Sequence, residues 1–164
     1  MLARFAEQAD NGIKPMKTSI PVSSLLHHKG SAVWHIAPET TVFDAIKLMA
    51  EKNIGALLVL SRDQLTGIFT ERDYTRKIAL MGKNSRDTRV AEVLSGKVAC
   101  VSPNDSIEEC MRLMTELRVR HLPVVEGEKV LGIVSIGDLV NWIISAQNSA
   151  IEQMEQYIAG GVTA

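Results

Sequence analysis

The strongest constraint on this chain is a motif that it contains twice. The sequence reads GIFTERD from Gly67 to Asp73 and GIVSIGD from Gly132 to Asp138, 65 residues later. The similarity continues upstream without a gap to Pro38 and Pro103, and most intervening pairs are identical or alike in kind. Self-similarity at a fixed spacing predicts a fold of repeated units, and two units of about 60 residues fill most of the chain.

Each unit contains the same order of predicted elements. Thr41 with Asp44, and Ser106 with Glu109, have the spacing of helix N-caps with a reciprocal acid. Apolar residues then recur at i, i+3, i+4 and i+7, which predicts a helix with one buried stripe. Two short apolar runs separated by a polar turn predict a hairpin, and a second helix begins at the end of the repeated motif. The order in each unit is strand, helix, strand, strand, helix.

The composition narrows the classes of function. Hydrophobic residues make up 46% and charged residues 23%, which is typical of a globular chain. A net charge of −1 argues against a nucleic-acid binder. The longest strictly apolar run, Ala56 to Leu60, is too short to cross a membrane, and the N-terminus lacks the apolar stretch of a secretory signal. We therefore expect a cytoplasmic protein that binds neither nucleic acid nor membrane, with a short N-terminal organelle address around Arg4 as the alternative.

Metal and thiol chemistry find little support in the sequence. Adjacent His27 and His28 cannot both chelate from one face, and no Cys or acid lies at a metal spacing nearby. Cys110 lies on a predicted apolar helix stripe, and Cys100 has no evident catalytic partner. We expect no metal site and no enzymatic activity.

The repeated motif has a second interpretation besides helix capping. Thr70 ends a predicted strand and Asp73 opens a helix, so both side chains can face one point beyond the strand. Carboxylates at helix N-termini often serve only as caps, and this alternative stays open. An ionised Asp can accept two hydrogen bonds from a vicinal diol such as ribose, and a helix N-terminus favours a phosphate. The motif therefore allows a nucleoside phosphate without requiring one.

The repeated G-h-x-[ST]-x-x-D motif, with Arg120-His-Leu-Pro-Val124 upstream of its second copy, resembles the CBS domain, named for cystathionine β-synthase. The resemblance covers roughly residues 22–144. It implies an α+β fold, a tandem pair of pseudo-symmetric β-α-β-β-α repeats packed through their sheets. The expected organisation is an N-terminal segment (1–20), a first repeat (21–82), a linker (83–89), a second repeat (90–145) and a C-terminal helix extension (146–164).

The resemblance implies two nucleotide sites, because CBS pairs bind adenosyl ligands in the cleft between their repeats. The Asp of each site would hold the ribose hydroxyls, with the Ser or Thr assisting. The first site would consist of Thr70, Arg72, Asp73, Val119, Arg120 and His121. The second site would consist of Ile54, Gly55, Ser135 and Asp138. Because Gly137 stands where the first repeat has Arg72, and Gly55 where the second has Arg120, we expect phosphate charge to be felt mainly at the first site.

The function implied by the resemblance is a non-enzymatic regulatory or sensor module for an adenosyl nucleotide. AMP is the first choice, and ATP or NAD are alternatives. A structural or scaffolding dimerisation module with vestigial sites is the rival hypothesis, and the regulated partner protein is not identified by the sequence. We also expect a homodimer that uses Val140 to Ile151, because the apolar pattern of the last helix continues past the core of its own domain. Trp142 and Tyr157 on this helix would lie either in a buried stripe or at the seam between subunits.

Overall fold

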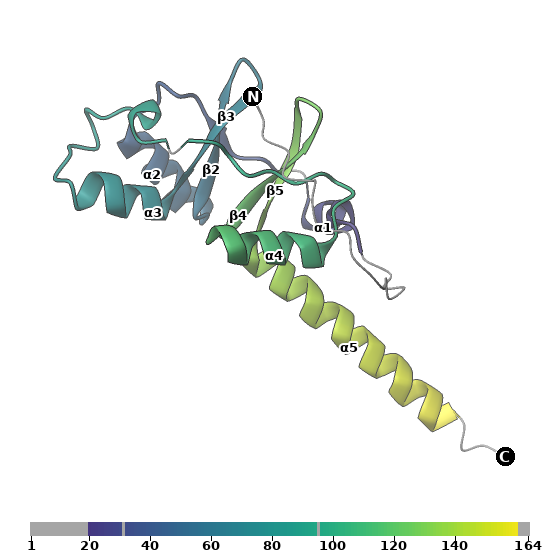
Figure 1. Cartoon of the computed structure of the whole chain (residues 1–164). Coiled ribbons are helices and arrows are strands. Elements are labelled where there is room, and N and C mark those ends of the chain that lie inside the picture. The colour runs from purple at the N-terminus through teal and green to yellow at the C-terminus, as the bar shows by residue number, and fades with distance from the viewer. Residues whose placement is uncertain (1–19, 31, 95, 161–164) are drawn as a thin grey trace.

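The structure is a computed structural model that describes residues 20–30, 32–94 and 96–160 (Figure 1). The predicted N-terminal segment therefore lies almost entirely outside the described residues. The first half of the described chain contains α1 (Val22–Lys29), β1 (His35–Ile36), α2 (Val42–Lys52), β2 (Ala56–Ser61), β3 (Gln64–Thr70), α3 (Glu71–Asp73) and the π-helix η1 (Tyr74–Ala79). The second half contains the 3-10 helix η2 (Val90–Glu92), α4 (Ile107–Leu117), β4 (His121–Glu126), β5 (Lys129–Ser135) and α5 (Ile136–Gly160).

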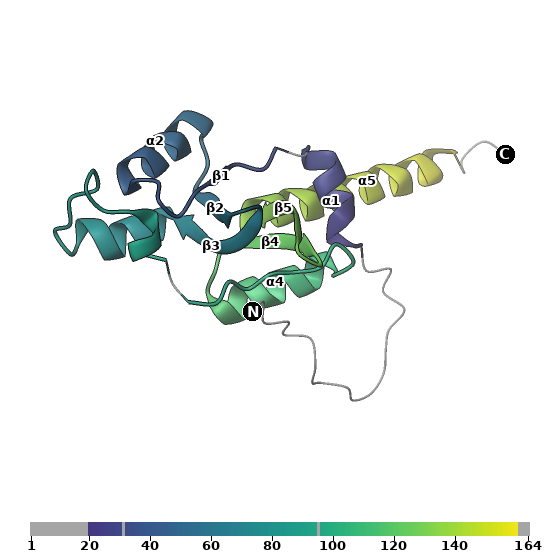
Figure 2. The same cartoon turned by 90° about the horizontal axis from the view of Figure 1, so that it is seen from above.

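Two small sheets form the centre of the molecule, one in each repeat. In the first, β1 pairs parallel to β2 and β2 pairs antiparallel to β3. In the second, β4 and β5 form the corresponding antiparallel hairpin, and a parallel bridge from Val101 to Val124 takes the place of β1. The sheets meet along β3 and β5, so that the two hairpins lie side by side (Figure 2). The α+β fold with paired repeats is confirmed.

The predicted helix caps form, but the two predicted reciprocal acids have other partners: Asp44 accepts from the Thr41 hydroxyl at 2.7 Å, and Glu109 accepts from Arg112 at 2.8 Å. The hydroxyls of Thr41 and Ser106 each accept a hydrogen bond at 3.1 Å from a backbone N–H three residues on. The apolar stripes of α2 and α4 are buried against their sheets. The predicted helix after the first motif ends before Gly82, and its Tyr74–Ala79 segment is a π-helix rather than an α-helix.

The start of each repeat packs into the core of the other repeat. Val22 and Leu25 of α1 are buried in the cluster formed by β4, β5 and α4. Val90 and Val93, which begin the second repeat in the chain, are buried in the cluster formed by α2, β2 and β3. The buried side chains thus form two clusters, and each one includes a segment that the sequence assigns to the other repeat.

This exchange accounts for the glycine of the repeated motif. A Cβ at Gly67 would lie 2.7 Å from a terminal methyl carbon of Leu94, and a Cβ at Gly132 would lie 2.8 Å from one of Leu26. Both distances are shorter than a carbon–carbon contact allows, so a larger residue would push the exchanged leucine away from the sheet. The glycine is therefore repeated because an exchanged leucine packs on the sheet at each position.

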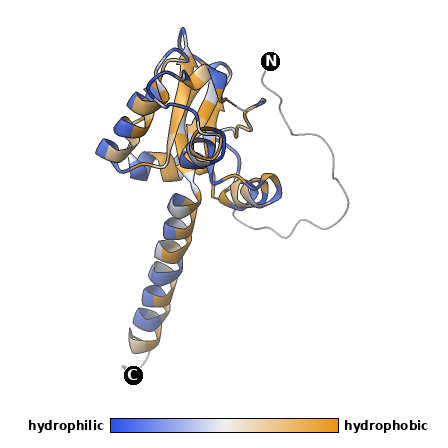
Figure 3. Ribbon diagram, turned by 90° about the vertical axis from the view of Figure 1, so that its left-hand side faces the viewer, coloured by the Kyte–Doolittle hydropathy of each residue, from blue (hydrophilic) through white to orange (hydrophobic). Residues whose placement is uncertain are grey.

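The last helix leaves the body of the molecule in its second half (Figures 1 and 3). Leu139 is fully buried, whereas Met154 is 67% exposed and Tyr157 is 85% exposed. Trp142 packs against the second core cluster, so the two aromatic residues of α5 have different environments. Among the helices of the described ranges, none is long and apolar enough to cross a membrane.

Candidate functional site

The first copy of the motif forms a capping box at the start of α3. The Thr70 backbone N–H and hydroxyl donate to Asp73 Oδ2 at 3.0 and 2.7 Å, and the Asp73 N–H donates to the Thr70 hydroxyl at 3.2 Å. The other carboxylate oxygen of Asp73 forms an ion pair with Lys77 at 2.8 Å. Both oxygens of Asp73 therefore have partners within the first repeat.

The second copy has the same cap and a different cation. The Ser135 N–H donates to Asp138 Oδ2 at 2.8 Å, and the Asp138 N–H donates to the Ser135 hydroxyl at 3.1 Å. Lys29, at the end of α1, donates to the same Oδ2 at 2.6 Å and to the backbone carbonyl of Ile133 at 3.1 Å. Lys29 is a site residue that the sequence did not reveal, because no spacing connects it to Asp138.

Lys29 changes the ionisation of Asp138. Burial of Asp138 opposes ionisation, but the hydrogen bond from Lys29 and the N–H of Ser135 outweigh it, so the pKa of Asp138 lies below its ordinary value. A carboxyl group with a lowered pKa in the folded state stabilises the fold above its unfolded pKa and loses that contribution as the pH falls. Asp138 is therefore a carboxylate at neutral pH.

The repeats contact each other beside both motifs. Arg72 donates to the carbonyl of Arg118 at 2.7 Å, which brings the first motif to the end of α4 and beside Val119. Within each repeat, an equivalent backbone hydrogen bond orients the turn. The Glu71 N–H donates to the carbonyl of Gly55 at 3.2 Å, and the Ile136 N–H donates to the carbonyl of Arg120 at 2.9 Å.

His121 lies between the two predicted sites. Its Cε1 would be 3.6 Å from a Cβ at Gly55, so it is next to a residue expected in the second site. Burial lowers the pKa of His121, the positive charges of Lys29 and Arg120 lower it further, and Asp138 opposes them. The imidazole is therefore mainly neutral at pH 7 and is better suited to donate one hydrogen bond than to neutralise a phosphate.

The remaining predicted residues lie at equivalent places in the two repeats. Ile54 packs against the first core cluster and Val119 against the second, directly after the helices α2 and α4. The Arg120 side chain is exposed beside His121. Arg72 and Val119 are thus brought together as the first site requires, whereas His121 faces Gly55 and the charges of the second site.

Two open hollows lie outside the predicted sites. One, of about 450 Å³, is lined by the two hairpin turns, and the other, of about 400 Å³, lies between α2 and the helix that follows the first motif.

Burial raises the pKa of Cys100 to about 11, and burial with nearby Asp105 and Glu109 raises that of Cys110 to about 12, which makes both thiols poor nucleophiles. Within the residues that the structure describes, no group of three or more His, Cys, Asp or Glu could hold a metal ion.

Comparison with known sequences identifies the repeats. A family model of the CBS domain matches residues 29–80 and 90–145. The chain is 38% identical over 137 residues to the mitochondrial CBS domain-containing protein CBSX3 of Arabidopsis thaliana, which covers 80% of this chain and 66% of that protein. It is 32% identical over 139 residues to the CBS domain-containing protein YhcV of Bacillus subtilis (strain 168), which covers 85% and 91%. The match thus spans just under two thirds of the length of CBSX3 and most of YhcV.

Solved structures show the same paired fold. A protein with CBS domains from Burkholderia ambifaria MC40-6, provisionally assigned to signal transduction, is 49% identical with a TM-score of 0.75, covering 78% of this chain and 96% of that one. A hexameric CBS-CP12 protein from bloom-forming cyanobacteria is 29% identical with a TM-score of 0.68, covering 90% and 88%.

Proposed function

This chain belongs to the CBS domain family, and on that basis we propose that it is a regulatory module that binds an adenosyl nucleotide between its repeats. AMP is the proposed ligand, with ATP or NAD as alternatives. Stand-alone CBS domain proteins are generally regulatory rather than catalytic, and the regulated partner would be a separate protein. A cytoplasmic location stays a prediction, and the mitochondrial relative favours an organelle address as its alternative.

One observation carries the proposal: the strand-to-helix turns of both repeats open where the repeats meet. The bond from Arg72 to Arg118 and the proximity of Gly55 to His121 join residues of different repeats beside the two Asp. A ligand there could contact both repeats at once, and its binding energy could couple their relative position to nucleotide concentration.

A structural module without a ligand is supported by a different observation. Asp73 and Asp138 each accept the backbone N–H of their cap residue, and each pairs with a lysine. These bonds account for both acids without a nucleotide. The two hypotheses therefore differ in whether the acids also bind a ribose.

Calorimetry with AMP and 2′-deoxy-AMP separates the hypotheses. Hydrogen bonds to a charged group contribute roughly 1.5–3 kcal/mol, so loss of one ribose hydroxyl should weaken binding about 10- to 100-fold. Asp73→Asn and Asp138→Asn should each weaken AMP to a similar extent. Asp44→Asn is the matched control, because Asp44 serves the N-cap of α2 in the same way away from either site. Equal affinity for the two nucleotides would leave the acids as helix caps alone.

We also propose a homodimer that uses the free face of α5. Exposed apolar side chains recur along this helix with spacings of three and four residues, and Gln147 takes the one polar position: Val140, Ile144, Ile151, Met154 and Ile158. This 3.5-residue period is typical of a helix that pairs with another helix. The α5 segment from residue 140 to 158 contains two Glu and no Lys or Arg, so it is poorly suited to an anionic membrane surface.

A further inference from the structure

We propose that Lys29 sets the ligand specificity of the second site, where it makes the site select phosphorylated nucleosides over neutral ones. A vicinal diol that donates to both carboxylate oxygens of Asp138 would need Oδ2, and Lys29 occupies that oxygen. A ligand must therefore displace the ammonium group, and only a ligand that carries its own negative charge compensates for the displacement. This inference rests on the proposed function, because it assumes that a nucleoside binds Asp138.

Lys29 already fills a hydrogen-bonding position beside Asp138 that a ligand would need. Its Nζ lies 2.6 Å from Asp138 Oδ2 and 3.1 Å from the carbonyl oxygen of Ile133. The same Oδ2 already accepts the Ser135 N–H at 2.8 Å. The Lys29 and Asp138 side chains are 36% and 23% exposed, so a ligand could reach the pair from solvent.

The ammonium group is delivered by an anchored helix. Val22 and Leu25 fix α1 in the core of the second unit, and Leu26 packs over Gly132, next to the carbonyl that Lys29 binds. The ring of His28 packs edge-on against Trp142 at 5.4 Å. Gly30, with φ of +85°, follows Lys29 directly. Because α1 is held on both sides, the backbone of Lys29 is already in place, and only its side chain has to be ordered when the ammonium group binds Asp138.

The first site has a different arrangement. Lys77 binds Asp73 from one turn further along the same segment, and it also donates to the carbonyl of Val93 at 2.6 Å. Lys77 therefore moves with its acid, whereas Lys29 comes from an element 109 residues away. At the second site, the cation that pairs with the Asp comes from a separate helix.

The charge balance determines which ligands are favoured. A neutral nucleoside that binds Asp138 leaves the Lys29 ammonium without its carboxylate. A nucleoside phosphate supplies a new acceptor for the displaced Lys29 ammonium group. If Lys29 is replaced by a neutral side chain, a diol can bind Asp138 without competition, while the uncompensated carboxylate repels phosphate.

Calorimetry on the intact chain tests this with Lys29→Met, using adenosine and AMP as probes. Adenosine should bind about three- to tenfold more tightly than to the wild type, since the displaced pair is partly exposed, and AMP should bind equally or more weakly. The preference for AMP over adenosine should fall accordingly. Lys47→Met, which removes one exposed charge from α2, should leave both affinities unchanged.

A double-mutant cycle assigns the effect to the second site. In an Asp138→Asn background, Lys29→Met should no longer tighten adenosine binding. Lys29→Gln serves as a second neutral variant if Lys29→Met unfolds. Unchanged affinities in the Lys29 variants, or equal weakening of both ligands, would overturn the proposal while leaving nucleotide binding intact. Absence of binding of either ligand to the wild type and to Lys29→Met would instead overturn the proposed function and this inference together.

Discussion

Leu25→Ala should destabilise the second unit of the structure, although Leu25 lies at the start of the first repeat in the chain. Leu25 is 3% exposed and lies in the cluster formed with β4, β5 and α4. The substitution removes about three methylene equivalents, each contributing about 0.8 kcal/mol. Because α1 is a short surface helix that can move toward the cavity, we expect a loss of about 2–3 kcal/mol, in the lower part of the range for such changes.

Hydrogen exchange of the two hairpins provides the assay. Leu25→Ala should reduce amide protection in β4 and β5 more than in β2 and β3. Val93→Ala is the matched variant, since Val93 is also 3% exposed but lies in the first cluster, and it should give the opposite pattern. Urea denaturation measures the total loss of stability. Greater exchange in β2 and β3 for Leu25→Ala, or the same pattern for both variants, would refute the exchanged packing.

Three further predictions concern the sites and the last helix. Arg120→Ala should remove most of the preference for AMP over adenosine at the first site and leave adenosine binding nearly intact in calorimetry; equal weakening of both would assign Arg120 to the fold. Lys29→Met should raise the pKa of Asp138, measured by NMR titration. The variant should therefore lose less stability than the wild type as the pH falls below about 4; an unchanged titration midpoint of Asp138 would contradict the ion pair. Ile151→Glu with Met154→Glu should convert a dimer to a monomer in sedimentation at micromolar concentration and leave the two repeats folded. A monomeric wild type would contradict the homodimer.

The elements and their order followed from local sequence patterns. Caps at Thr41 and Ser106 depend on bonds to residues three positions away, so their spacing is visible in the chain. The hairpin turns are also local, and positive φ at Asp63 and Gly127 agrees with the polar turn residues found there. Such interactions join near neighbours, and this is why one sequence is enough to predict them.

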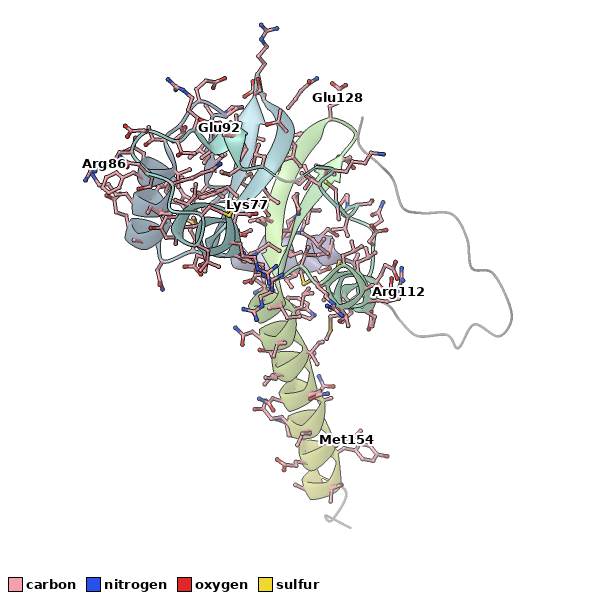
Figure 4. All side chains as sticks on the ribbon, turned by 60° about the vertical axis from the view of Figure 1, so that its left-hand side comes forward. Lys77, Arg86, Glu92, Arg112, Glu128 and Met154 are labelled. Carbon is pink, nitrogen blue, oxygen red and sulfur yellow. The ribbon has the colours of Figure 1, made fainter. Side chains whose placement is uncertain are left out.

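The orientation of the last helix was predicted less well. The apolar pattern of this helix is continuous in the sequence, yet Leu139 is fully buried. Met154, further along the same helix, projects beyond the body (Figure 4). Periodicity shows which residues share a helix face, but it does not show where the supporting sheet ends. Which apolar residues of α5 are exposed therefore depends on where the body of the molecule ends, and a sequence pattern does not contain this information.

The charge of the two sites could not be obtained from the repeat because alignment compares only equivalent positions. The alignment of the two repeats matches Arg72 with Gly137 and Arg120 with Gly55, and it therefore predicts cations mainly at the first site. Lys29 lies upstream of the aligned region, and it reaches Asp138 only because α1 packs on the opposite repeat. The exchange that requires a glycine in each motif therefore also supplies a cation to the second site. A cation that arrives through such an exchange leaves no pattern at its target, and its effect on phosphate selection follows from the folded geometry alone.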